Sequence, residues 1–236
     1  MANSTILYAC TDDGLAIFNK PGTLPEWLPP RHVLPGKHVT SAWGEPGPPI
    51  RVLAVADGTL LLSENGGRTW DAVGPEAGAS GSVVSLSYEE AGHVLFAHLD
   101  GGVWQSTDGG ATWQVQPAGT LPTAPDDQNA GYIASLPADM LAYVLVPGAA
   151  GMPPALVVGT SAGLEVSQDG GTTWTQPTLP QEGAVTALAR DPERRDRLYA
   201  ATDGGYLAES GNRGQTWQAI NTEPLARVAS IYVVRI

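Results

Sequence analysis

Four aspartates of this chain each stand directly before a glycine and between two apolar runs: Asp13, Asp57, Asp100 and Asp203. Carboxylates gathered on one face of a protein could attract a cation or a polyhydroxylated ligand. A simpler interpretation is that aspartate suits tight Asp-Gly turns and faces solvent there. We favour the turn interpretation and keep the four residues as candidate ligand-binding side chains.

A second acidic group lies in a long connection, residues 118–140, which contains Asp126, Asp127 and Tyr132. A carboxylate pair beside an aromatic ring could hold a sugar, or act as acid and base in glycoside hydrolysis. Adjacent aspartates in a proline-rich, solvated loop more often have no such role, and we favour that interpretation. Because a connection of this length without repeat structure is uncommon and often functional, these three residues join the candidate ligand-binding set.

The other reactive side chains predict neither a catalytic nor a metal site. The histidines at positions 32, 38, 93 and 98 lack carboxylate or cysteine partners at ligand spacing. The single cysteine, Cys10, lies in the apolar run ILYAC and is interpreted as a core residue. We therefore expect no metal and no cofactor, and we assign no catalytic residue.

Charge and hydropathy restrict the partners. With 24 acidic and 12 basic residues the net charge is −12, which disfavours nucleic acid and anionic membranes as partners. No run approaches the roughly 18 apolar residues of a membrane span. The start, MANSTILYACTDDG, shows neither a basic segment nor an adequate apolar one, so we expect no signal peptide and a cytoplasmic location. We also expect a monomer. A protein or a carbohydrate is the expected ligand.

The elements that would position these residues repeat along the chain. Five tryptophans recur with steps of 43, 43, 61 and 43 residues: Trp27, Trp70, Trp113, Trp174 and Trp217. Counting from the last one to the chain end, and on from the start to the first, gives 46 residues. A period of this length is typical of stacked supersecondary units, and its near-closure across the chain ends predicts a ring.

Four of the five tryptophans end one eight-residue motif, Ser-x-Asp/Asn-x-Gly-x-Thr-Trp, at 63–70, 106–113, 167–174 and 210–217. An Asp or Asn side chain can accept hydrogen bonds from backbone N–H groups of its own turn, and glycine permits positive φ. A buried Trp stabilises a protein more than one turn hydrogen bond does. We expect structural roles for the motif residues Asn65, Trp70, Asp108, Trp113, Asp169, Trp174, Asn212 and Trp217.

With these motifs the chain resembles the Asp-box, or BNR-repeat, propeller families, which include sialidases, xyloglucan-cleaving glycosidases, sortilin-like receptors and photosystem II assembly factors. The resemblance covers four units, because FNKPGTLPEW before Trp27 lacks the Ser, the Asp and the Thr. It implies that the Asp box lies at the blade periphery, away from the ligand face. Neither Arg51 nor Arg235 precedes Ile-Pro, so the arginine signature of sialidases is missing.

Each unit divides into four strands, as in VTALARD (185–191), RLYAATD (197–203), GYLAESG (205–211) and TWQAI (216–220). The first unit begins at a second strand, 6–12, so VASIYVV at 228–234 is predicted to supply its first. In the fourth unit the first strand falls at 141–146, which we prefer, or at 132–139.

The predicted fold is therefore all-β, with residues 1–236 forming a single domain. We expect a five-bladed β-propeller of four-stranded antiparallel blades, with the C-terminal strand pairing into the N-terminal blade to close the ring. The expected function is non-catalytic binding or scaffolding, with the ligand on the face that carries the Asp-Gly turns and the 118–140 loop. The alternative is a sialidase-like or xyloglucanase-like glycoside hydrolase that uses carboxylates of that face.

Overall fold

The computed structural model describes residues 4–45, 50–74, 83–89, 94–99, 102–115, 136–137, 139–148 and 153–236. In these ranges every regular element is a β-strand, and the strands form antiparallel sheets of three or four strands. The described part of the chain is therefore all-β, as predicted.

The strands of the described ranges group into five sheets, which we number I to V. Sheet I contains β19 (Val228–Arg235), β1 (Thr5–Thr11), β2 (Gly14–Lys20) and β3 (Arg31–Val33). Sheet II contains β4 (Val39–Glu45), β5 (Arg51–Ala56), β6 (Thr59–Ser63) and β7 (Asp71–Ala72). Sheet III contains β8 (Val83–Glu89), β9 (Val94–Leu99), β10 (Gly102–Ser106) and β11 (Gln114–Val115). Sheet IV contains β12 (Met140–Val146), β13 (Ala155–Thr160) and β14 (Gly163–Ser167). Sheet V contains β15 (Val185–Arg190), β16 (Leu198–Thr202), β17 (Leu207–Ser210) and β18 (Gln218–Ala219).

The strands of sheet I come from both ends of the chain. Strand β19 pairs antiparallel with β1, from Thr5 opposite Arg235 to Thr11 opposite Val228. Backbone hydrogen bonds between Ser4 and Ile236, 2.8 and 3.0 Å, extend this pairing by one residue. The predicted pairing of the C-terminal strand with the N-terminal unit is therefore present.

Sheet IV settles the choice between two predicted first strands. The first strand of this sheet is β12, which pairs with β13 from Val146 opposite Ala155 to Met140 opposite Thr160. The preferred interpretation, a strand near 141–146, is confirmed. The expected fourth strand is reduced to one isolated bridge, Val166 to Thr175, so sheet IV has three strands instead of four.

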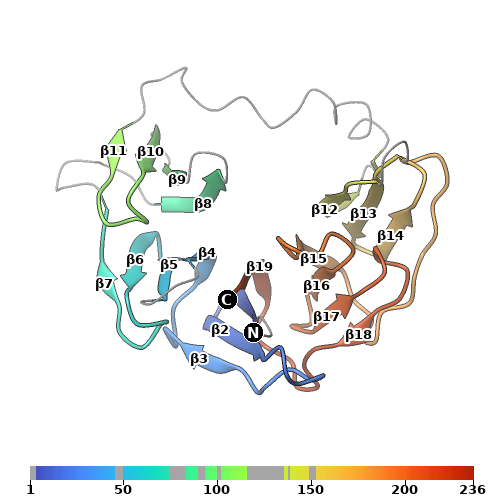
Figure 1. The fold of residues 1–236 in the computed structure, drawn as a ribbon, viewed down its shortest axis with the longest axis horizontal. Helices are drawn as coiled ribbons and strands as arrows, with labels where there is room; N and C mark the ends of the chain where they lie inside the picture. The colour runs from blue at the N-terminus through green and yellow to red at the C-terminus, as the bar shows by residue number, and fades with distance from the viewer. Residues whose placement is uncertain are drawn as a thin grey trace.

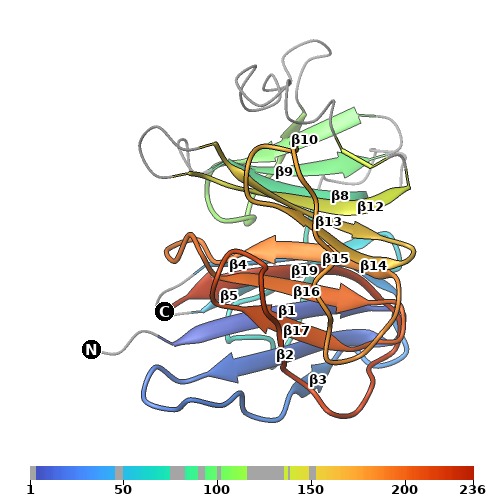
Figure 2. The same cartoon turned by 90° about the vertical axis from the view of Figure 1, so that its right-hand side faces the viewer.

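The sheets are arranged like the blades of a propeller. Contacts between their first strands follow the order β8, β4, β19, β15, β12. Figure 1 shows these strands near the middle and the short strands β3, β7, β11 and β18 at the outside. In the side view of Figure 2, the strands of sheets I and V lie next to one another.

The hydrophobic core consists of clusters between neighbouring sheets. Leu7 and Ala9 of sheet I pack with Tyr199 and Leu207 of sheet V, and comparable clusters join I to II, II to III and IV to V. Since alternate side chains of β1 and of β16 enter different clusters, these strands are buried on both faces. This explains why their sequences are apolar without alternation.

Candidate functional site

The four repeated motifs form one kind of hydrogen-bonded turn after the third strand of sheets II to V. In the motif of sheet III, the hydroxyl of Ser106 donates to Oδ1 of Asp108 over 2.8 Å and accepts from the N–H of Gly110. Oδ1 of Asp108 also accepts from the N–H of Thr112, 2.9 Å. The same bonds recur around Asn65, Asp169 and Asn212.

Hydrogen bonds inside these turns stabilise the ionised carboxylates. Although partial burial opposes ionisation of Asp108, hydrogen bonds from Thr112 and Ser106 hold its pKa below the usual value. The backbone and hydroxyl of Thr173 lower the pKa of Asp169 to about 2. Both carboxylates are thus engaged by their own turns, which fits the structural role that we expect for them.

The motif tryptophans pack beside these turns. The indole N–H groups of Trp113, Trp174 and Trp217 donate to the glycine carbonyl of their own motif, over 2.9, 3.1 and 2.8 Å. Trp113 and Trp217 are buried between sheets, whereas Trp70 and Trp174 are half-buried. The fifth tryptophan, Trp27, packs edge-on against Phe18 and Tyr199, in contact with sheets I and V.

Three of the four Asp-Gly turns are described, and they define what we call the turn face, with residues 12–13, 57–58 and 203–204. Oδ2 of Asp57 contacts Nζ of Lys37 at 2.9 Å, and its Oδ1 accepts from the N–H of His38. The hydrogen bond from Lys37 holds the pKa of Asp57 below its usual value. Oδ1 of Asp13 accepts from the N–H of Gly36. These two aspartates therefore share one connection, residues 34–38.

The other candidate carboxylates are not brought to that connection. Asp203 hydrogen-bonds through its backbone to Ala184, within sheet V and the connection before it. Asp100, Asp126, Asp127 and Tyr132 lie outside the described residues. Across the described ranges, no three His, Cys, Asp or Glu side chains gather as metal ligands.

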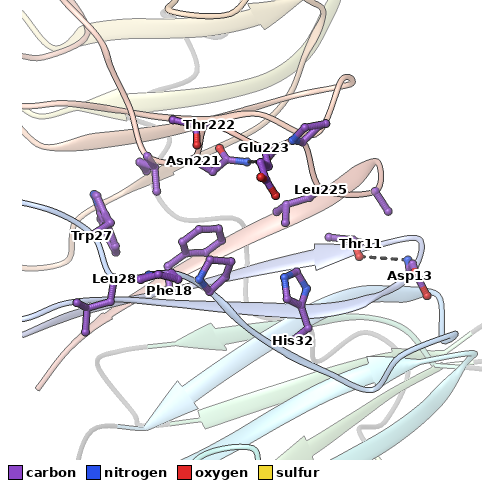
Figure 3. Close-up of a pocket in the computed structure, with 15 residues that line it drawn as sticks. Thr11, Asp13, Phe18, Trp27, Leu28, His32, Asn221, Thr222, Glu223 and Leu225 are labelled. Atoms are coloured by element: carbon purple, nitrogen blue, oxygen red, sulfur yellow. Dashed lines mark hydrogen bonds between the residues drawn. The ribbon is translucent and has the colours of Figure 1, made fainter.

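A cleft of about 570 Å³ lies between sheets I and V, and we call it the I–V cleft. One wall consists of residues 27–30 with Phe18 and His32, and the other of residues 220–226 from the β18–β19 connection. Thr11 and Asp13 extend the cleft to the turn face. Figure 3 shows Leu28 and His32 on the first wall, with Glu223 and Leu225 opposite them.

The second wall is held by one side chain. Oδ1 of Asn221 accepts from the N–H of Leu207, 2.7 Å, while its Nδ2 donates to the carbonyls of Gly205 and Glu223. This fixes the connection against sheet V. The walls expose apolar groups, including Leu28 with 40% of its surface accessible, and the exposed side chain of Glu223 adds a carboxylate.

Of the residues that line this cleft, only Asp13 is among the ligand-binding candidates predicted from the sequence. Trp27, Leu28, His32 and Glu223 were not singled out as ligand-binding. A usable signal was the departure of the first unit from the motif, since PGTLPEWLPP replaces the polar turn by prolines and apolar residues.

Neither a family model nor a curated protein matches this chain. Among solved structures, the chain is similar to YCF48 bound to D1 peptide, with 15% identity, 92% of this chain and 82% of that chain covered, and a TM-score of 0.45. It is also similar to the nidogen/laminin complex, with 11% identity, 98% of both chains and a TM-score of 0.40. It is similar, too, to the GH74 enzyme of Niastella koreensis, with 17% identity and a TM-score of 0.38, and the match covers 91% of this chain and 43% of that chain. Within the described part, no helix is long and apolar enough to span a membrane.

Proposed function

We propose that this chain is a five-bladed propeller of the Asp-box type, monomeric and closed by its C-terminal strand, whose task is to bind a protein segment rather than to catalyse a reaction. The five sheets, the β1–β19 pairing and the four similar turns support this architecture. Sheets III and IV would be adjacent in the closed ring.

The I–V cleft is the proposed binding site. Its volume of about 570 Å³ lies in the range of ligand sites, and its walls, which combine apolar and polar side chains, are open to solvent at Leu28 and at Pro224. This cleft is the observation that carries the proposal. It reaches the turn face through Asp13, so it extends the ligand face expected from the sequence.

The contacts of Asp13 and Asp57 favour a binding role for these two carboxylates over a hydrolytic one. Asp57 is paired with Lys37, and one oxygen of Asp13 holds the backbone of Gly36. The acid and base of a glycosidase need carboxyl groups that reach the substrate from two sides. Asp13 and Asp57 are instead committed to the 34–38 connection.

The partner is a protein segment with apolar and basic side chains. Trp27 makes edge contacts with two rings, and Nζ of Lys20 lies 5.6 Å from its ring centroid, so it is poorly placed as a stacking platform for a sugar. Leu28 and Leu225 offer apolar surface, while Glu223 and Asp13 attract a lysine or an arginine. The net charge of −12 acts in the same direction.

Selection of a phage-displayed library of random dodecapeptides on the wild-type protein tests this proposal. Leu28→Asp introduces a charge into the apolar wall and should weaken the selected peptides at least about tenfold. Leu24→Asp is the matched control, because Leu24 is 47% exposed but does not line the cleft. Peptides that bind both variants equally would contradict the proposed site.

The alternative function has a separate test. A chromogenic glycoside that the protein hydrolyses, with turnover abolished by Asp126→Asn or Asp127→Asn, would replace binding by catalysis. If the protein bound sugars on a glycan array and the peptide selection yielded no binder, the ligand would be a carbohydrate instead of a protein segment.

A further inference from the structure

Strand β14 of sheet IV pairs with a single outer residue, whereas the third strands of sheets II, III and V each pair with two. Aligned on the repeated motif, Thr175, Gln176 and Pro177 correspond to Asp71, Ala72 and Val73 of sheet II, and to residues 218–220 of sheet V. In sheet II the N–H of Val73 donates to the carbonyl of Leu60 over 2.9 Å, and in sheet V residue 220 donates likewise to residue 207.

Proline explains why sheet IV stops earlier. Val166 and Thr175 exchange two backbone hydrogen bonds, 2.8 and 2.9 Å. The next donor in this register would be the N–H of Pro177, opposite Leu164, but proline has no N–H. The outer strand therefore ends at a single bridge, and the chain leaves the sheet.

Leu164 consequently presents an unused backbone pair. In an antiparallel ladder, residues two apart direct their N–H and C=O groups to the same side. Because Val166 bonds outward to Thr175, the N–H and C=O of Leu164 also face outward. Among the described residues, no backbone hydrogen bond from the outer side reaches them.

A cavity lies where the missing strand would run. It has a volume of about 520 Å³ and is lined by the β13–β14 turn, Leu164, residues 176–179, Glu182 and Gly183. Ser161 and Ala162 of that turn are exposed, as is Glu182. The opening thus gives an extended chain access to the edge of β14.

We propose that this edge accepts an extended, non-proline segment of a partner protein as an added strand of sheet IV. One residue of the segment donates its N–H to the carbonyl of Leu164 and accepts from the N–H of Leu164, as in other β-strand additions. The exposed carboxylate of Glu182 favours a basic side chain beside that residue. This site is independent of the I–V cleft.

The test uses random heptapeptides displayed on phage and selected on the Leu28→Asp variant, in which the I–V cleft is impaired. Pro177→Val restores the N–H that Val73 supplies in sheet II, so the edge should close and the selected peptides should weaken at least about tenfold. Pro180→Ala serves as the matched control, because Pro180 lies outside the cavity lining and should leave binding unchanged.

Backbone methylation of a selected peptide provides a readout that side-chain recognition would not give. Methylating the N–H of the pairing residue removes one hydrogen bond and should weaken binding about three- to tenfold, with little effect at the neighbouring positions. Should Pro177→Val not fold, Ala162→Trp, which fills the cavity mouth, replaces it. The proposal would be overturned if the selected peptides bound Pro177→Val, or its replacement Ala162→Trp, as tightly as the parent protein. It would also be overturned if methylation weakened binding equally at every peptide position, or if the selection gave no binding peptide.

Discussion

At the level of single residues, the short polar side chain and the indole of each repeated turn have different structural roles. Asp108 collects hydrogen bonds from Ser106 and Thr112 at an exposed position. Trp113 is 9% exposed and packs between sheets II and III. The polar residue fixes turn geometry, while the indole contributes burial.

The two kinds of residue should differ in their effect on stability. Trp113→Ala should lower the free energy of unfolding by about 3–5 kcal/mol, because it leaves a cavity between two sheets. Asp108→Ala should cost about 1–2 kcal/mol, since hydrogen bonds at an exposed turn contribute modestly. Urea denaturation measures both, and equal losses would contradict this division.

The depressed pKa of Asp169 predicts an acid-dependent contribution to stability. Its folded pKa is about 2 against a reference of 3.8, so the stabilisation is complete above the unfolded pKa and is lost as the pH falls towards 2. Asp169→Asn retains the turn, as Asn65 and Asn212 do, but removes the titration. The difference in Tm between wild type and variant should therefore be largest near neutrality and should shrink as the pH falls through 2. A difference in Tm that does not depend on pH would show that the ionisation of Asp169 is not the source of this stabilisation.

At the level of elements, a buried ion pair fastens strand β19 to sheet V. Nη1 of Arg235 lies 3.0 Å from Oδ2 of Asp191, and both side chains are almost fully buried. Oδ1 of Asp191 accepts from the N–H groups of Glu193 and Arg194, and Nε of Arg235 lies 3.3 Å from Glu193. The last strand is thereby joined to sheet V as well as to β1.

Removal of one member of this buried ion pair should lower the stability of the protein strongly. Arg235→Ala leaves the carboxylate of Asp191 buried without its cation, so unfolding should become easier by about 3–5 kcal/mol. Arg227→Ala on the same segment is the control, because Arg227 is 58% exposed and 3.9 Å from Asp12, where a surface pair is worth about 0–1 kcal/mol. Thermal melts of both variants measure these effects. Similar losses of stability in the two variants would show that the buried ion pair contributes no more than a surface pair.

Strand positions were largely predictable, because they follow local patterns. The apolar runs gave β1, β16 and β19 within one or two residues, and the preferred first strand of the fourth unit matches β12. The shortened outer strand of sheet IV was missed, although Pro177 carries the signal. Pairings such as Asp57 with Lys37 depend on how connections meet in space, which turn motifs do not encode.

At the level of the whole molecule, the two ends of the chain build one structure. Lys20 and Glu209, 189 positions apart, form a salt bridge of 2.5 Å, and Trp27 contacts Tyr199. The walls of the I–V cleft come from equally distant segments. The sequence analysis did not assemble this cleft, because most of its residues belong to no repeated motif and its two walls meet only when sheets I and V pack.

Deletion of the final eight residues should unfold the molecule as a whole. Without most of β19, sheet I loses its first strand and the core between sheets I and V loses Val233. Circular dichroism of the shortened chain should show loss of the cooperative melt. A melting temperature equal to that of the full chain would contradict the proposed closure.

The most direct test of the proposed binding site is hydrogen–deuterium exchange of the wild-type protein with and without a dodecapeptide selected on it. Amides of residues 27–33 and 220–227 should gain protection together, because the peptide contacts both walls of the I–V cleft. Protection confined to one of these segments, or located elsewhere on the chain, would contradict the account.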